Sequence, residues 1–131
     1  MAVRKKITYT VTPLRKDPAT GKSGKPPAAA DNAKTPFERA NALYGQARYR
    51  EALVEYDRAL ELAPQHVAAL VNRGTTLARL DRFAESLLCY EQAAALDPVN
   101  VDILYKRAGT LHALNRFDEA IAAYGRVLDL A

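Results

Sequence analysis

Residues 67–98 read VAALVNRGTTLARLDRFAESLLCYEQAAALDP, and the order of small and large residues in this stretch recurs on both sides of it. Pro64 and Pro98 lie 34 residues apart. Four more rows of residues keep the same interval: Leu43, Leu77 and Leu111; Tyr49, Phe83 and Phe117; Ala52, Ser86 and Ala120; and Tyr56, Tyr90 and Tyr124. Because several independent rows share one register, the sequence predicts an array of structural repeats.

Each 34-residue unit has the pattern of two helices joined by a short turn. Thr35, Pro36 and Glu38 supply an N-cap residue, a proline at the first helical position and a glutamate three residues after the cap, which together predict a capping-box start. We expect helix pairs over residues 35–47 and 50–62, 67–80 and 84–96, and 101–114 and 118–130. The second helix of each pair opens with a glutamate, which favours the positive end of the helix dipole.

Size alternation predicts how the two helices of a pair pack. A small residue on the first helix, such as Gly74, would let a tyrosine on the second, such as Tyr90, approach closely. Arginines recur at 48, 82 and 116 in the turns and at 39, 73 and 107 in the first helices. Since acidic residues accompany them in every unit, we expect structural ion pairs or carbonyl caps more than a nucleic-acid stripe.

From about Thr35 to Ala131 the chain resembles the tetratricopeptide repeat family. The residues that carry the resemblance in the middle repeat are Leu70, Gly74, Leu77, Phe83, Ser86, Tyr90, Ala93 and Pro98. The chain departs from the family pattern at Pro36, where a bulky residue is usual, and at the three helical arginines, where leucine is commoner. The resemblance implies an all-α solenoid of three antiparallel helix-turn-helix repeats, at about 35–66, 67–100 and 101–131.

Residues 1–34 differ in composition from the rest. They hold eight basic and two acidic residues, with four prolines and two glycines, whereas residues 35–131 hold eleven basic and thirteen acidic residues. We therefore expect a mostly disordered basic tail, with one strand-like piece at residues 7–12. Gly21 to Ser23 resemble the end of a phosphate-binding loop, but Lys16 occupies the place of the required glycine. The scattered charges with the single aromatic Tyr9 make nucleic-acid binding a weak alternative.

Several function classes find no support in the sequence. No run of 18 apolar residues predicts a membrane span, and the N-terminus lacks the apolar run of a secretory signal, so a cytoplasmic location is expected. Cys89 is the single cysteine and lacks the partners of a zinc site. His66 follows Pro64 in a turn, and nothing in the sequence indicates a function for it. His112 is not predicted to be catalytic, because no acidic or nucleophilic residue lies at a recognisable spacing from it. We expect neither an enzyme nor a cofactor.

The resemblance implies that the first helices line a concave groove. Its expected lining is Phe37, Asn41, Tyr44, Val71, Asn72, Thr75, Arg79, Tyr105, Lys106 and His112. Amide side chains can satisfy the backbone of an extended peptide, while aromatic pockets select its side chains. We therefore predict a protein-interaction module or scaffold that binds an extended peptide or a partner helix in this groove.

Two subfamilies offer more specific readings. One subfamily, co-chaperones that bind a C-terminal carboxylate, has asparagines at the positions of Asn41 and Asn72. Phe37 and Asp102, however, occupy the positions of two of its lysines, which argues against carboxylate binding here. Asn72 also resembles one rung of the asparagine ladder that precedes O-linked N-acetylglucosamine transferase domains. The alternative function is thus the substrate-recognition region of a larger glycosyltransferase.

The last repeat predicts an uncovered apolar face. Solenoids normally close with a polar capping helix, and none follows residues 118–130. We expect either that further sequence follows or that the chain self-associates through residues such as Leu114, Ile121, Leu128 and Leu130.

Overall fold

The structure of the protein, a computed structural model, describes residues 34–131. Six helices follow one another in this range: α3 (Pro36–Gly45), α4 (Tyr49–Leu62), α5 (Val67–Arg79), α6 (Phe83–Leu96), α7 (Val101–Ala113) and α8 (Phe117–Leu130). The expected tail, with its strand-like piece at residues 7–12, lies outside the described residues. None of the six helices is long and apolar enough to cross a membrane.

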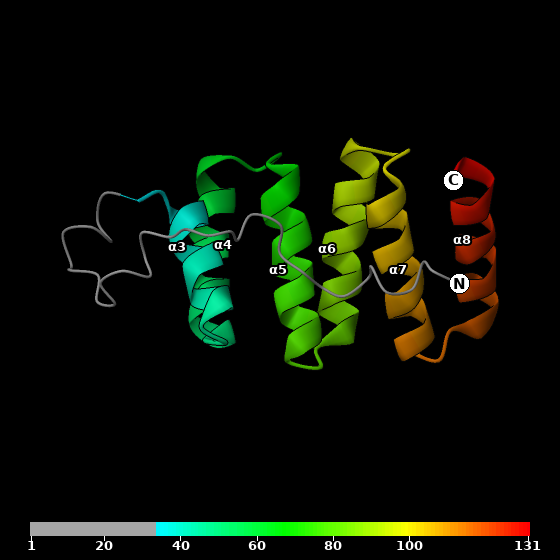
Figure 1. Ribbon diagram of the computed structural model, residues 1–131, viewed down its shortest axis with the longest axis horizontal. Coiled ribbons are helices and arrows are strands. Elements are labelled where there is room, and N and C mark those ends of the chain that lie inside the picture. The colour runs from blue at the N-terminus through cyan, green and yellow to red at the C-terminus, as the bar shows by residue number, and fades with distance from the viewer. Residues whose placement is uncertain (1–33) are drawn as a thin grey trace.

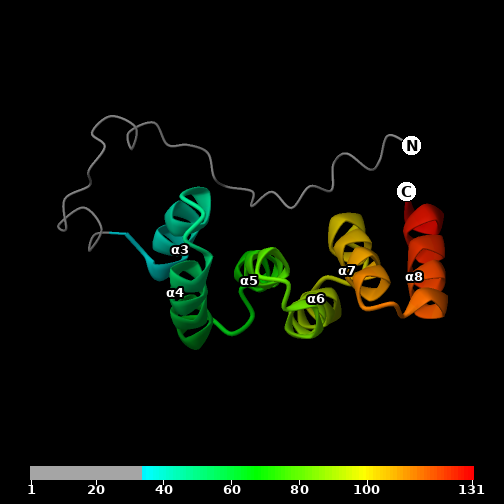
Figure 2. The same ribbon diagram turned by 90° about the horizontal axis from the view of Figure 1, so that it is seen from below.

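The helices form one row of antiparallel pairs that runs from α3 and α4 at one end to α7 and α8 at the other (Figure 1). Each helix packs mainly against its neighbours along the chain. α3, α5 and α7 lie along one side of the row, and α4 and α6 lie along the opposite side (Figure 2). The prediction of an all-α solenoid of three helix pairs is confirmed.

The first helix of each pair ends one or two residues earlier than the sequence predicts. The residues Ala47, Asp81 and Asn115, which recur at the 34-residue interval, have φ angles of 62°, 60° and 62°. This left-handed turn stops the helix, and the next amide then reaches back five residues, as from Arg82 N to the Leu77 carbonyl at 2.9 Å. The sequence did not predict this turn, because none of the three residues is glycine, the residue that usually adopts this conformation.

The helix starts are capped by side chains at recurring positions. The capping box at Thr35 and Glu38 is present, as the sequence predicts. His66 and Asn100, 34 residues apart, play the same role for α5 and α7, since each side chain accepts the backbone N–H three residues ahead at 3.2 Å. Two chemically different residues therefore satisfy the same unpaired amide of the first turn.

The turn arginines form ion pairs, as the sequence predicts. Arg82 Nε donates to Oε1 of Glu85 at 2.7 Å and its Nη2 donates to Oε2 at 2.8 Å. Arg48 with Glu51, and Arg116 with Glu119, repeat this arrangement on the exposed surface. Hydrogen bonds from the arginines lower the pKa of all three glutamates below the ordinary value of 4.5.

Acid should weaken the fold partly through these turn glutamates. Because their pKa is lower in the folded chain than in the unfolded chain, each ionised pair stabilises the fold above about pH 4.5, and that contribution is lost as the pH falls through the lowered value. In urea unfolding, a triple variant Glu51→Gln, Glu85→Gln, Glu119→Gln should lose less stability between about pH 6 and pH 3 than the wild type does. Glu61→Gln, at an exposed position of α4, is the control for the loss of a surface carboxylate.

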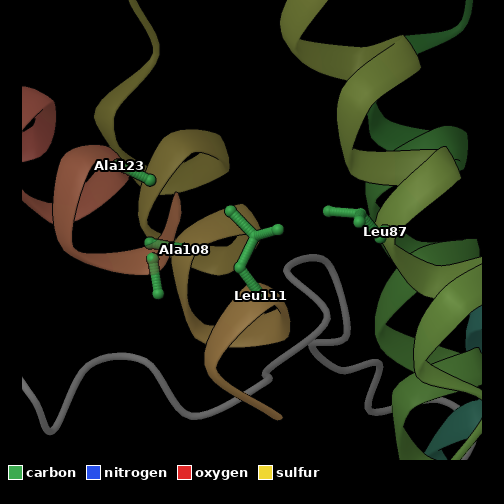
Figure 3. Packing of buried hydrophobic residues seen from close by; sticks show 5 residues of the cluster. Leu87, Ala108, Leu111 and Ala123 are labelled. Atoms are coloured by element: carbon green, nitrogen blue, oxygen red, sulfur yellow. The ribbon is translucent and has the colours of Figure 1, made fainter. Parts of the chain in front are cut away.

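Buried side chains between consecutive helices form the core. Leu53, Leu77 and Cys89 make one cluster, and Leu87, Ala108 and Leu111 belong to another. Figure 3 shows Leu87 of α6 pointing toward Leu111 of α7, across the boundary between the second and third pairs. The core is thus a chain of small clusters along the array, as expected for a solenoid in which each repeat contacts its neighbours.

The close approach predicted between a small residue and a tyrosine is present in the second pair. A Cβ atom at Gly74 would lie 2.8 Å from Cε1 of Tyr90 and 3.1 Å from Cβ of Cys89. Ser86 Oγ donates to the Gly74 carbonyl at 2.7 Å, which ties α6 to α5 at the same point. Any larger residue at position 74 would force the Tyr90 ring or its neighbours to shift.

Gly74→Ala should therefore destabilise the protein by about 1–3 kcal/mol through overpacking. Gly109→Ala is the matched control, because it is also a mid-helix glycine but its added Cβ would meet Tyr124 at an ordinary 3.6 Å. That variant should be neutral or gain up to about 1 kcal/mol from the better helix propensity of alanine. Chemical denaturation of both variants checks the pair, and equal effects would contradict the packing argument.

Candidate functional site

The side of the array formed by α3, α5 and α7, here called the inner face, carries buried polar side chains near its middle. Asn41 of α3 and Asn72 of α5 are 8% and 3% exposed. The Asn72 amide donates from Nδ2 to Oδ1 of Asn41 at 3.1 Å, and the Tyr56 hydroxyl of α4 donates to the same oxygen. This network links the first two repeats through groups that the sequence places 31 and 15 residues apart.

Tyr56 acts as a hydrogen-bond donor in this network. Burial raises the pKa of its hydroxyl above the ordinary value of 10, because the charged phenolate would be poorly solvated there. Within residues 34–131, the side-chain hydrogen bonds of this network engage Oδ1 of Asn41 and Nδ2 of Asn72. Each amide side chain also carries a second polar group, and the pair of a donor and an acceptor is the combination that the backbone of an extended peptide requires.

A second contact joins the first two repeats at the turn end of the inner face. Arg79 Nε donates to the Tyr44 hydroxyl at 3.1 Å, and the guanidinium carbon lies 6.0 Å from the centre of the Tyr44 ring. Tyr44 also packs edge-on against Tyr49, with 5.2 Å between ring centres. Tyr44 is buried, whereas Arg79 is exposed and presents a cation to the surface.

The third repeat contributes a paired charge. Lys106 is only 6% exposed, and its Nζ donates to both carboxylate oxygens of Asp102 at 3.0 Å, one helical turn earlier on α7. The exposed Asp102 carboxylate thus balances the buried ammonium within the same helix. A carboxylate from a ligand would have to compete with Asp102 for this cation.

The structure places the remaining predicted groove residues at different depths. Thr75 is fully buried and lies 2.9 Å from the Tyr90 hydroxyl, so it supports the inner face from within the α5–α6 pair. Phe37 and Tyr105 are half-buried, with ring contacts to His66 at 4.5 Å and Tyr124 at 5.5 Å. Of the other two, Val71 is half-buried and packs against the core, and His112 is exposed beside the Phe117 ring.

A family comparison agrees with this architecture. A sequence model described as tetratricopeptide repeat matches residues 37–88 and, in overlapping fashion, residues 72–131. The chain belongs to the tetratricopeptide repeat family. A comparison of this sequence with curated proteins found no match.

Solved structures of tetratricopeptide repeat proteins have the same fold. The first tetratricopeptide repeat domain of Spaghetti, bound to the HSP90 peptide SRMEEVD, is 28% identical with a TM-score of 0.69, over 72% of this chain and 75% of that one. The second such domain of Spaghetti, bound to the same peptide, is 20% identical with a TM-score of 0.69, over 80% and 100%. MamA from Desulfovibrio magneticus RS-1 is 22% identical with a TM-score of 0.69, over 72% and 54%. The two matches below 25% identity support the fold alone.

Two threonines of this tetratricopeptide repeat array were missed by the sequence reasoning. Thr76 Oγ1 donates to the Asn72 carbonyl at 2.7 Å, and Thr110 Oγ1 donates to the Lys106 carbonyl at 2.8 Å. Both threonines are buried and lie one turn after the inner-face residue they contact. Their 34-residue spacing was a signal in the sequence, because the residues they hold keep the same interval.

A double-mutant cycle can measure the Asn41 network. Asn41→Ala should cost about 1–3 kcal/mol of stability, because it leaves the fully buried Tyr56 hydroxyl without its acceptor. Tyr56→Phe removes that hydroxyl, so the double variant should lose less than the sum of the two single variants. Urea unfolding of the four proteins supplies the coupling energy, and strict additivity would contradict the network.

Proposed function

We propose that this protein is an interaction module whose inner face binds an extended peptide segment of a partner protein. The observation that supports this proposal is the pair Asn41 and Asn72, whose amides meet between α3 and α5. Their second donor and acceptor groups would bind the backbone of the peptide. Half-buried Phe37 of α3 and Tyr105 of α7 would contact the peptide's side chains. Backbone recognition with flanking aromatic contacts suits an extended peptide.

The likeness to the first tetratricopeptide repeat domain of Spaghetti, which was solved with a bound HSP90 peptide, supports a peptide as the ligand class. This chain differs in how its inner-face charge is used, because Lys106 is already paired with Asp102. A C-terminal carboxylate would gain little from a cation that another carboxylate neutralises. We therefore propose recognition of an internal segment, read by its backbone and side chains.

The glycosyltransferase alternative remains a prediction. It depends on a nucleotide-sugar-binding domain outside the present sequence, and Asn72 is the single residue that favours it. A peptide-binding inner face would serve either role, since substrate selection by such an enzyme also requires binding of protein segments.

Selection of peptides from a random displayed library on the wild-type chain tests the proposed function. The affinity of a selected peptide is then measured by calorimetry against Asn72→Ala, with Arg50→Ala, an exposed residue of α4, as the control. We expect Asn72→Ala to weaken binding about tenfold, as for the loss of a buried hydrogen bond, and Arg50→Ala to leave it unchanged. Circular dichroism confirms that both variants are folded.

Two further arms separate the alternatives. Amidation of the peptide's C-terminus should leave the affinity unchanged, and a large loss would show that the carboxylate is what the chain recognises. Binding that is insensitive to Asn72→Ala but lost on removal of residues 1–34 would place recognition in the tail and overturn the proposal.

A further inference from the structure

The start of α5 depends on the protonation state of one side chain. His66 is the N-cap residue of α5, and its Nδ1 atom accepts the backbone N–H of Ala69 at 3.2 Å. A ring nitrogen accepts a hydrogen bond only while it carries no proton, so this cap requires the neutral imidazole with its proton on Nε2. Asn100 caps α7 in the same way, also at 3.2 Å, but its amide side chain does not titrate.

The position of His66 makes a protonated imidazole unfavourable for two reasons. Protonation of Nδ1 removes the acceptor of the Ala69 amide, and it also places a positive charge at the positive end of the helix dipole. The first turn of α5 has no acidic residue to offset this charge, whereas the first turn of α7 has Asp102. Protonation of His66 would therefore weaken the start of α5.

The charged side chains on the helices beside His66 are engaged elsewhere or exposed. On α3, Glu38 belongs to the capping box of its own helix, and Arg39 pairs with Glu55 at 3.2 Å. In the last turn of α4, Glu61 is exposed. Recruitment of Glu38 by a protonated His66 would break that capping box, and recruitment of Glu61 would order an exposed side chain. Neither carboxylate would therefore replace the lost cap without a cost.

The imidazole of His66 also joins the first two repeats. The ring centre of Phe37, on α3, lies 4.5 Å from that of His66 and 6.2 Å from that of Tyr56. The Phe37 ring would attract a protonated imidazole, but at a partly exposed site this attraction is comparable with the repulsion by the helix dipole. It leaves the lost hydrogen bond uncompensated, so the net effect of protonation is a weaker contact between α3 and α5.

We propose that His66 is a pH-sensitive junction between the first two repeats, and that its protonation weakens the binding of a peptide to the inner face. Phe37 belongs to that face, and Asn72 lies in the second turn of α5, directly after the capped turn. The consequence for binding rests on the proposed function. Because an imidazole gains its proton near about pH 6.5 in an unfolded chain, the cap stabilises the fold above that pH and is lost as the pH falls below it.

Urea unfolding at about pH 7.5 and about pH 5.5 tests the cap without any ligand, each protein being compared with itself. The unfolding equilibrium constant of the wild type should rise about three- to fivefold more over this range than that of His66→Asn, because asparagine caps a helix and does not titrate. His112→Gln removes the other histidine of the chain and is the control. It should lose at least as much stability in acid as the wild type, since a protonated His112 would favour the last turn of α7.

Calorimetry at the same two pH values, with a histidine-free peptide selected from the displayed library, tests the effect on the inner face. The affinity of the wild type should fall about twofold or more in acid, and that of His66→Asn should stay the same. In NMR spectra of the wild type, the Ala69 amide resonance should shift over this pH range. The Ile103 amide, which Asn100 caps, should not shift and is an internal control.

Three outcomes would overturn the proposal. Equal pH dependence of stability in the wild type and in His66→Asn would show that His66 does not act as a pH-sensitive cap. A pH-dependent stability with a pH-independent affinity would show that the cap does not regulate the inner face. Failure to select any peptide would contradict the proposed function and with it the regulation of binding, whereas the unfolding measurements would still decide whether the cap responds to pH.

Discussion

The buried tyrosine on the second helix of the first and second pairs is the constraint on which the rest of the structure depends. Tyr56 and Tyr90 have no exposed surface, and each fills the space left by a small residue on the first helix. This fit sets the distance between the two helices. The tyrosine hydroxyls reach Asn41 and Thr75, so the contact that fixes the packing also orients polar side chains at the inner face.

The third pair shows what happens when one part of this arrangement changes. Gly109 stands where Asn41 and Thr75 stand in the earlier repeats, and Tyr124 is half-buried where its counterparts are fully enclosed. The inner face of the third repeat is therefore shaped by the Tyr105–Tyr124 ring contact and by the Lys106–Asp102 pair. The array combines an amide network in its first two repeats with an aromatic and charged surface in its third.

Much of the fold could be predicted from this sequence because its rules are local and repeated. The 34-residue interval is repeated along the chain, and the capping box at Thr35 and the turn arginines depend on residues three positions apart; all were confirmed. The left-handed turns at Ala47, Asp81 and Asn115 were missed, since the residue types there do not require that conformation. The Lys106–Asp102 pair was equally local, at a spacing of four residues, and was a signal that the sequence reasoning passed over.

The sequence by itself determined the repeat length, the helix pairs and the rows of residues that pack, because periodic spacing on a helix dictates which side chains share a face. Only the tertiary structure decided that Asn41 and Asn72 meet, that Thr75 is enclosed, and that Ile121 is exposed where Leu53 and Leu87 are covered. These contacts and exposures depend on the orientation in which one helix pair packs against the next. That orientation arises from the summed packing of side chains distant in sequence, which no local spacing encodes.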